Sequence, residues 1–184
     1  MLGAACMLGG CMGLTARAPT EFLDERTGIS VVPLPAPLEF VQDLQRASLE
    51  VGKRPSFAYL GVVEWDRAGH VSDGLWLHIV PGMDGQPGDI HAAGALTLTL
   101  DDGPVTLPLM EAPVTGRQPF HPVPAWGQTA YFAVDPRLLG RMATSHSLVL
   151  AVRGAQGSLM SFTPVHDDRK ALMDFLRARG STPD

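Results

Sequence analysis

Two apolar runs joined by a polar turn, between Phe57 and Val80, form the strongest pattern along the chain. The first run, from Phe57 to Trp65, is apolar on both of its alternating faces until Glu64, which is typical of a strand buried in the middle of a β-structure. The tetrapeptide 66–69, Asp-Arg-Ala-Gly, favours a turn, because Asp bonds the backbone and Gly accepts a positive φ. The return run to Val80 alternates again. The pattern therefore predicts a long central β-hairpin.

Two further hairpins are predicted on the C-terminal side of the first. Alternating Leu and Thr at 96–100 lead into Asp-Asp-Gly at 101–103, and this turn between alternating runs is a strong hairpin signal. Segments 147–152 and 158–162 form the third hairpin. Single strands are expected at 28–32 and 129–134, and a short strand at Leu38 is expected to continue as an irregular or helical connection to Val51.

Helical signals occur at two places. Asp135-Pro136 favours a short helical turn, because Asp accepts backbone N–H groups at an N-cap and Pro fits the first helical position. A C-terminal helix is predicted after Asp167 or Asp168, with an apolar stripe along one face and Gly180 as its end.

These elements predict a mainly β protein. About eight or nine short strands with hairpin turns and one terminal helix favour an antiparallel immunoglobulin-like β-sandwich with a C-terminal α-helix. A small closed β-barrel is the rival architecture. Residues 21–184 are expected to form one domain, because the length of 184 residues lies within the range of single domains.

Composition narrows the functional classes. The net charge is −5 and 18% of the residues are charged, so the chain lacks the concentrated basic face that nucleic acid requires. The 20 glycines and 16 prolines suit short strands and turns. No run of 18 apolar residues exists in the sequence.

Both cysteines of the chain, Cys6 and Cys11, lie at the N-terminus. The sequence Leu-Gly-Gly-Cys at 8–11 resembles the lipobox of bacterial lipoproteins, which has an aliphatic residue, two small residues and then Cys. The resemblance implies cleavage before Cys11 and attachment of a diacylglyceryl group to its sulfur. Residues 1–10 are then part of a signal segment, and 11–20 a tether. Met12 replaces the Asp associated with inner-membrane retention, which implies the periplasmic face of the outer membrane.

Catalytic signatures are missing from the sequence. It contains no HExxH, GxSxG, Walker or GxGxxG pattern, and its six histidines are scattered. The adjacent Ser145-His146 does not by itself make a nucleophile–base pair. Helix capping explains the Asp residues of His166-Asp167-Asp168, and a solvated loop explains Asp84, Asp89 and His91, whose spacing matches no calcium loop. No catalytic residue, metal ligand or cofactor is therefore predicted.

The Pro-rich stretch 110–128 offers a candidate partner-binding site at Phe120, His121 and Trp126. Rings held among prolines present rigid aromatic surface at low entropy cost. The alternative is that both rings fold back and cover an open end of the domain.

Beyond the lipobox, the chain resembles the uncharacterised periplasmic domains of Gram-negative lipoproteins. The resemblance covers the extended start at 22–32, the central hairpin and the closing Phe-Leu helix, and it implies no assigned activity. The expected function is a non-enzymatic, lipid-anchored accessory protein that binds an envelope protein. The alternatives are a small-ligand or lipid carrier with a cavity between its sheets, and a hydrolase or metal enzyme using loop His and Asp residues.

Overall fold

The computed structural model describes residues 20–43, 55–82, 94–111, 126–153, 159–167 and 169–180. The elements in these ranges are β1 (Phe22–Asp24), β2 (Ile29–Pro33), β3 (Leu38–Gln42), β4 (Phe57–Arg67), β5 (His70–Val80), β6 (Ala95–Leu100), β7 (Gly103–Met110), β8 (Gln128–Ala133), α2 (Pro136–Thr144), β9 (Val149–Arg153), β10 (Leu159–Pro164) and α3 (Arg169–Ala178).

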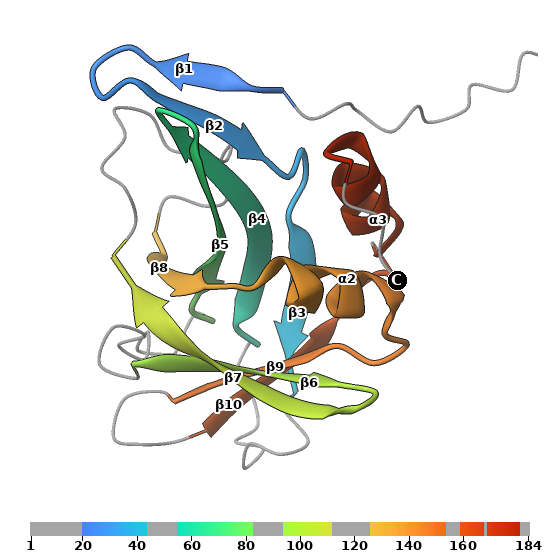
Figure 1. Cartoon of the computed structure of the whole chain (residues 1–184). Helices are drawn as coiled ribbons and strands as arrows, with labels where there is room; N and C mark the ends of the chain where they lie inside the picture. The colour runs from blue at the N-terminus through green and yellow to red at the C-terminus, as the bar shows by residue number, and fades with distance from the viewer. Residues whose placement is uncertain are drawn as a thin grey trace, which may run out of the picture.

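The described strands form an antiparallel β-barrel, with two further strands attached to its wall (Figure 1). The order β4-β3-β10-β9-β6-β7-β8-β5 returns to β4, because β5 also pairs with β4, and this pairing closes the ring. The prediction of a mainly β protein is confirmed, and the structure supports the rival barrel. The immunoglobulin-like sandwich is not supported, because a sandwich leaves two separate sheets whereas these strands form one continuous closed sheet.

The predicted hairpins are all present. β4 and β5 pair along their whole length, from Phe57 opposite Val80 to Arg67 opposite His70. Their turn places both Ala68 and Gly69 at positive φ, and the Asp66 carboxylate accepts the N–H of Gly69 at 2.7 Å. β6 pairs with β7, and β9 pairs with β10, as the turn signals indicated.

Strand β4 is shared by three neighbours. One edge pairs with β5, whereas the other pairs with β3 near the start of β4 and with β2 near its end. Between the two, the N–H of Leu34 donates to the carbonyl of Val62 at 2.8 Å. Prolines at 33, 35 and 37 surround this change of partner, where the chain leaves β2 and enters β3. The far half of the β4–β5 hairpin therefore extends beyond the barrel together with β2 and β1, a strand the sequence reading missed.

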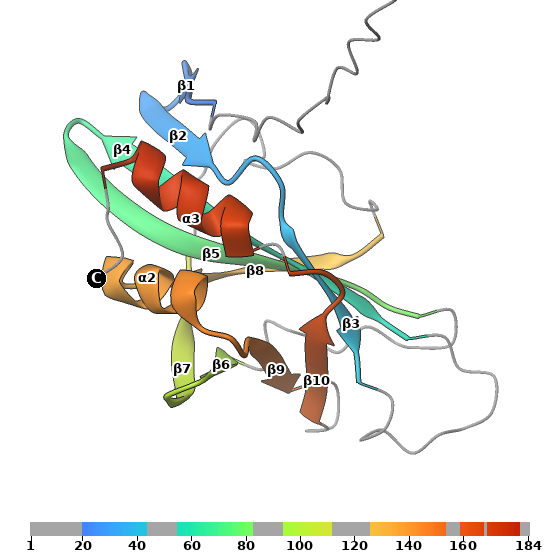
Figure 2. The ribbon, with the colours of Figure 1, turned by 90° about the vertical axis from the view of Figure 1, so that its right-hand side faces the viewer.

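The main core lies inside the barrel and beneath the two described helices (Figure 2). Phe40, Phe132 and Phe162 are buried there from three different strands, and Leu139 of α2 and Phe175 of α3 pack against the same cluster. Asp135 caps α2 as predicted, since its carboxylate accepts the N–H of Arg137 at 2.7 Å. Neither α2 nor α3 is long and apolar enough to cross a membrane.

A second apolar cluster lies on the outer face of β2, β4 and β5. Trp76 and Trp65 are 0% and 2% exposed there, because each lies across a glycine of the opposite strand. A Cβ at Gly61 would be 2.1 Å from the Trp76 ring, and one at Gly74 would be 2.5 Å from the Trp65 ring. The two glycines are therefore required by packing. They explain why the central run is apolar on both faces.

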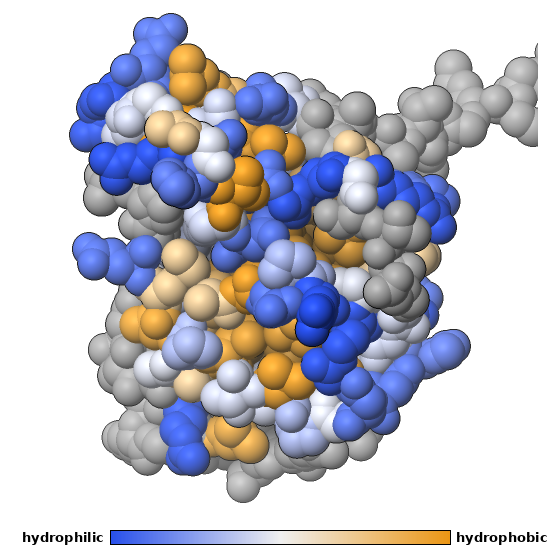
Figure 3. Space-filling view, viewed as in Figure 1, coloured by the Kyte–Doolittle hydropathy of each residue, from blue (hydrophilic) through white to orange (hydrophobic). Residues whose placement is uncertain are grey.

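The barrel wall is incomplete between β7 and β8, which pair only at Leu109 and Met110. The N–H of Leu109 points toward β6. The backbone nitrogens at alternate positions of β7, including those of Pro104 and Pro108, therefore lie on the edge of β7 that faces away from β6. Proline has no N–H, so this edge offers few donors to another strand. Apolar residues gather at the surface between β7 and α2 (Figure 3).

We expect Gly61→Ala to destabilise the protein by about 1–3 kcal/mol, the usual cost of overpacking. Alanine normally stabilises a strand interior by about 0.5–1 kcal/mol relative to glycine, so the sign of the change is diagnostic. The measurement is the free energy of unfolding from urea titration. Ser72→Ala, at an exposed position of β5, is the control and should stay within about 0.5 kcal/mol of the wild type. A Gly61→Ala variant as stable as the wild type would contradict the Trp76 contact.

Candidate functional site

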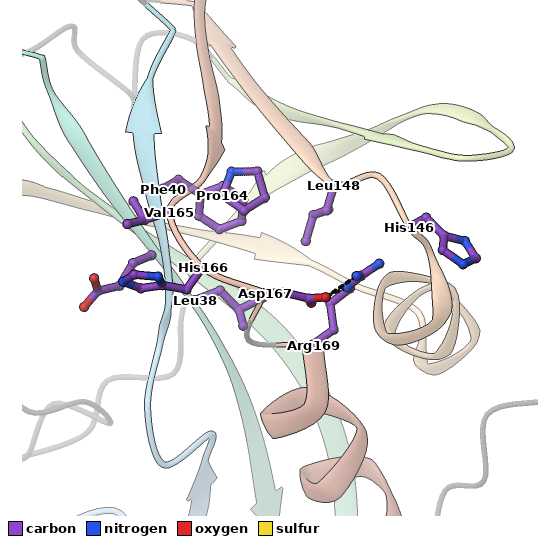
Figure 4. Close-up of a pocket in the computed structure, with 10 residues that line it drawn as sticks. Leu38, Phe40, His146, Leu148, Pro164, Val165, His166, Asp167 and Arg169 are labelled. Carbon is purple, nitrogen blue, oxygen red and sulfur yellow. Dashed lines mark hydrogen bonds and ion pairs between the residues drawn. The ribbon is translucent and has the colours of Figure 1, made fainter.

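A pocket of about 300 Å³ lies where β3, the connection from β10 to α3, and the connection from α2 to β9 meet (Figure 4). It is lined by Leu38, Glu39, Phe40, His146, Leu148, Pro164, Val165, His166, Asp167 and Arg169. The volume is at the lower end of the range typical of small-molecule sites.

The floor of the pocket is apolar and belongs to the barrel core. Leu38, Phe40 and Leu148 are almost fully buried, whereas Val165 is 38% exposed and forms part of the wall. Sheet pairing fixes these positions: Pro164 lies opposite Phe40, and the N–H of Val165 donates to the carbonyl of Glu39 at 2.9 Å. The apolar lining is therefore held by strands rather than by a free loop.

Asp101, in the turn between β6 and β7, holds the α2–β9 connection in place. Its carboxylate accepts the backbone N–H groups of His146 at 2.6 Å and Ser147 at 2.8 Å, and it lies 3.1 Å from Nδ1 of His146. These hydrogen bonds, led by the one from the His146 backbone, hold the pKa of Asp101 below its usual value. The neighbouring Asp102 makes a bidentate ion pair with Arg141 of α2, at 2.7 and 2.9 Å.

The Ser145-His146 pair does not form a nucleophile and base. The hydroxyl of Ser145 donates to the carbonyl of Ser147 at 2.6 Å and accepts the N–H of Asp101 at 2.9 Å. The imidazole of His146 instead contacts Asp101, and its side chain is 92% exposed. Both residues therefore serve to fix the connection that carries Leu148 into the pocket.

Arg169, the first residue of α3, joins two walls of the pocket. Its guanidinium donates to both oxygens of the Asp167 carboxylate and to the carbonyl of Ser145. The guanidinium hydrogen bonds lower the pKa of Asp167, and Arg169 also bonds it through the backbone. These side-chain contacts are an ion pair rather than a helix cap, so the predicted capping role of Asp167 stays a prediction, and Asp168 lies outside the described residues.

Two polar side chains on the pocket rim have no partner among the described residues. The carboxylate of Glu39 and the imidazole of His166 are exposed, and neither takes part in a hydrogen bond or ion pair there. They come from neighbouring segments, because Glu39 bonds the residue directly before His166 through its backbone carbonyl. The Glu39 side chain lies on the outer face of β3 beside Tyr59 of the paired strand, so it is directed away from the pocket floor.

A second hollow, of about 330 Å³, lies on the outer face of β6, β9 and β10. Its described lining consists mainly of small aliphatic and hydroxyl side chains, including Thr97, Ala151 and Ser161. It has fewer charged groups than the first pocket and no aromatic residue in that lining, so its chemistry specifies less about a ligand.

Asp73, which flanks the central turn, belongs to a structural ion cluster. It lies opposite Glu64 on the paired strand, and Arg179 beyond the end of α3 contacts both carboxylates, with Nη2 at 2.9 Å from Asp73. Burial raises the pKa of Asp73, since its side chain is 5% exposed, and Arg179 opposes that rise. The guanidinium also lies over the Phe175 ring at 5.3 Å. The cluster fixes α3 against the hairpin.

The other residues named from the sequence do not converge on the pocket. Trp126, just before β8, is 69% exposed, so its ring does not fold back over the domain. His78 is buried and contacts Thr129 at 2.8 Å, as expected of a packed imidazole. The described ranges do not include the following candidate residues named from the sequence: Cys11, Phe120, His121, Asp84, Asp89 and His91.

Within the described ranges, no group of three or more His, Cys, Asp or Glu side chains could hold a metal ion. No protein-family model matches the chain, and comparisons with the curated proteins and with the solved structures found no match. The chemistry of the pocket is therefore the observation from which a function is inferred.

We expect the stability of the Asp101→Asn variant to fall less at acidic pH than the stability of the wild type. The pKa of Asp101 is lowered in the folded protein. The stabilisation by its ionised form is therefore fully present above the pKa of Asp in the unfolded chain, about 4. That stability is lost as the pH falls through the lower folded-state pKa. Urea midpoints between pH 7 and pH 2.5 measure the effect.

The wild type should lose stability below about pH 4 more steeply than Asp101→Asn. Ser147→Ala keeps the backbone N–H that Asp101 accepts, so it should follow the wild-type profile. Identical profiles for the wild type and Asp101→Asn would contradict the assigned role of this carboxylate.

Proposed function

We propose that the protein is a non-enzymatic, lipid-anchored module of the cell envelope that binds a partner protein at the pocket. The observation that carries this proposal is the combination of an apolar floor with polar side chains around it, namely those of His166, Asp167 and Arg169. Binding sites typically pair apolar lining with a few convergent polar groups. The floor here belongs to strands of a packed barrel, which limits the ordering cost of binding.

The cellular location of the protein is proposed from the sequence around Cys11. Cleavage before this residue and acylation of its sulfur would hold the folded domain at a membrane through residues 11–20. Each buried CH₂ of an acyl chain contributes about 0.8 kcal/mol, so more than one chain gives a stable anchor. The proposed location is the periplasmic face of the outer membrane.

Trp126 is proposed as a second contact with the partner, together with Phe120 and His121 before it in the chain. Exposed tryptophan side chains are frequent anchors in protein interfaces, because a large ring is buried at little entropy cost. The 69% exposure of Trp126 makes its ring accessible to a partner.

The carrier alternative receives less support from the described strands. A carrier requires space inside the barrel, whereas Phe40, Phe132 and Phe162 point into that interior and are at most 1% exposed. The hydrolase alternative requires several His and Asp side chains within hydrogen-bond reach of each other. Asp101 and His146 meet, but Asp167 pairs with Arg169 instead.

One experiment tests the lipid anchor and the partner-binding pocket together. The protein is expressed with its native upstream region in a Gram-negative host, and carries a photo-crosslinking amino acid at Val165 in the pocket wall. We expect a diacyl or triacyl mass increment on Cys11, membrane association, and a discrete crosslinked protein.

Two matched variants separate the parts of this proposal. Cys11→Ala should abolish the mass increment and the membrane association together. The crosslinker at Leu23, an exposed apolar position on β1, should give no discrete product. An unmodified soluble wild type would refute the anchor, and equal crosslinking at Val165 and Leu23 would refute the pocket as the binding site.

A further inference from the structure

We propose that α3 is a proton-controlled latch: one proton taken up by the carboxylate pair Glu64 and Asp73 tightens the attachment of the helix to the β4–β5 hairpin. The helix packs against this hairpin and starts at Arg169, which lines the pocket (Figure 2). Release of α3 therefore moves one wall of the pocket. The latch depends on how α3 is attached, on the charge buried at its end, and on the response of that charge to pH.

Side chains, rather than a strand ladder, hold α3 to the barrel. Within the described ranges, the backbone hydrogen bonds of its residues stay inside the helix and its C-terminal turn. Arg169 bonds the Ser145 carbonyl at one end, and Arg179 contacts the hairpin carboxylates at the other. Such an element can open on its own, because no described backbone bond to a strand has to break. The apolar side chains that it buries in the main core are Leu172, Phe175 and Leu176.

The cluster at the end of α3 contains two carboxylates and one guanidinium. Glu64 and Asp73 lie opposite each other on β4 and β5, and Nη2 of Arg179 contacts both, at 2.9 Å from Asp73. The side chains of Glu64, Asp73 and Arg179 are 19%, 5% and 13% exposed. Two charges of −1 and one of +1 sum to −1. The docked helix therefore holds one excess negative charge in a place that little water reaches, which is costly.

The elements around the cluster present apolar residues or cations that are bound elsewhere. β2 places Val32 opposite Glu64, and the pair next to Asp73 on the side of β8 is Gly74 with Ala133. Among the described residues, Arg179 is the cation that acts on Asp73. The cations of α3 and α2 with described ion pairs are bound outside the cluster: Lys170 and Arg177 to Asp174, and Arg141 to Asp102.

The buried charge makes the docking of α3 depend on pH. Burial raises the pKa of Asp73, and Arg179 opposes that rise without cancelling it. When α3 leaves, water reaches the carboxylate and its pKa returns toward the ordinary value of about 4. The docked form therefore binds a proton more strongly than the released form, so docking tightens as the pH falls from neutral toward about 4. Carboxylates with a lowered pKa, such as Asp167, weaken the fold only below that range.

Hydrogen exchange of the ¹⁵N-labelled full chain measures the opening of α3. The amide exchange rates are followed by NMR at pH 7.5 and pH 5 and corrected for the intrinsic rates, which gives an opening constant for each amide. In the wild type, the opening constant of the α3 amides should fall at least about threefold from pH 7.5 to pH 5.

Asp73→Asn tests the carboxylate that takes up the proton. Asparagine keeps the size of the side chain without its charge, so α3 should open less than in the wild type at pH 7.5. Its opening constant should then change by less than about twofold between the two pH values. The imidazole of His146, at the other end of α3, is unchanged in this variant. Glu25→Gln, which removes an exposed carboxylate in the β1–β2 turn, is the matched control and should keep the wild-type pH dependence.

Two further variants test the cluster without changing Asp73. Glu64→Gln leaves Arg179 to Asp73 alone, so the pH dependence of α3 opening should become weaker than in the wild type. Arg179→Gln leaves the two carboxylates without their cation, so α3 should open more at pH 7.5 and the pH dependence should become steeper.

Three results would overturn the latch. If α3 opens more in Asp73→Asn than in the wild type at both pH values, the cluster is an ordinary structural ion pair. If the wild type and Asp73→Asn share one pH dependence, the proton is taken up by other groups. If the α3 amides open only together with the β4 amides at both pH values, α3 is not released as a separate element.

Discussion

Strand β4 must satisfy three neighbours at once, and the rest of the structure depends on this constraint. Its hydrogen bonds to β5 close the barrel, those to β3 support the wall that carries the pocket, and those to β2 hold the outer extension. A strand in this position is buried on both faces. Its sequence therefore has to place apolar side chains inside for the core. On the outer face, Gly61 of β4 leaves room for Trp76, and Gly74 of β5 leaves room for Trp65 of β4.

The same constraint positions the candidate site. Leu38 of β3 lies opposite Leu60 of β4, and Phe40 lies opposite Ala58, so the pocket floor is an extension of the central hairpin. The remaining walls are also held by polar side chains. Asp101 fixes the α2–β9 connection, and Arg169 joins that connection to the start of α3. Rigid support from strands and fixed polar anchors is what a recognition site requires to present its groups in one arrangement.

Local features of the fold could be predicted from the sequence because they depend on neighbours in the chain. The alternation around 66–69 and the Asp-Gly at 102–103 identified the hairpins, and Asp135 and Gly180 marked helix ends that the structure confirms. The sequence favoured the sandwich over the barrel, whereas the structure supports the barrel, because this choice depends on pairings between distant segments. β3 pairs with β10 and β6 pairs with β9, and periodicity carries no information on either pairing.

The pocket was missed for the same reason. Its lining comes from β3, from the segment after α2 and from the segment after β10, and these residues are dispersed in the sequence. Asp167 and His146 were considered as chemical groups, but their partners Arg169 and Asp101 only become apparent in three dimensions. The one local signal was Leu38-Glu39-Phe40, a charged residue between two apolar ones, which is the ordinary pattern of any half-buried strand.

Native-state hydrogen exchange at increasing urea concentrations tests most directly whether β4 is the shared support. The account predicts that the backbone amides of β2 and β3 that pair with β4 become exposed in the same cooperative opening as the β4 amides, with one free energy and one urea dependence. Separate openings of β2 and β3, each at lower free energy than β4, would contradict the predicted cooperative opening. If β3 instead opens together with β10 and β9 while β4 is already exposed, the claim that the barrel wall and its pocket depend on β4 is contradicted.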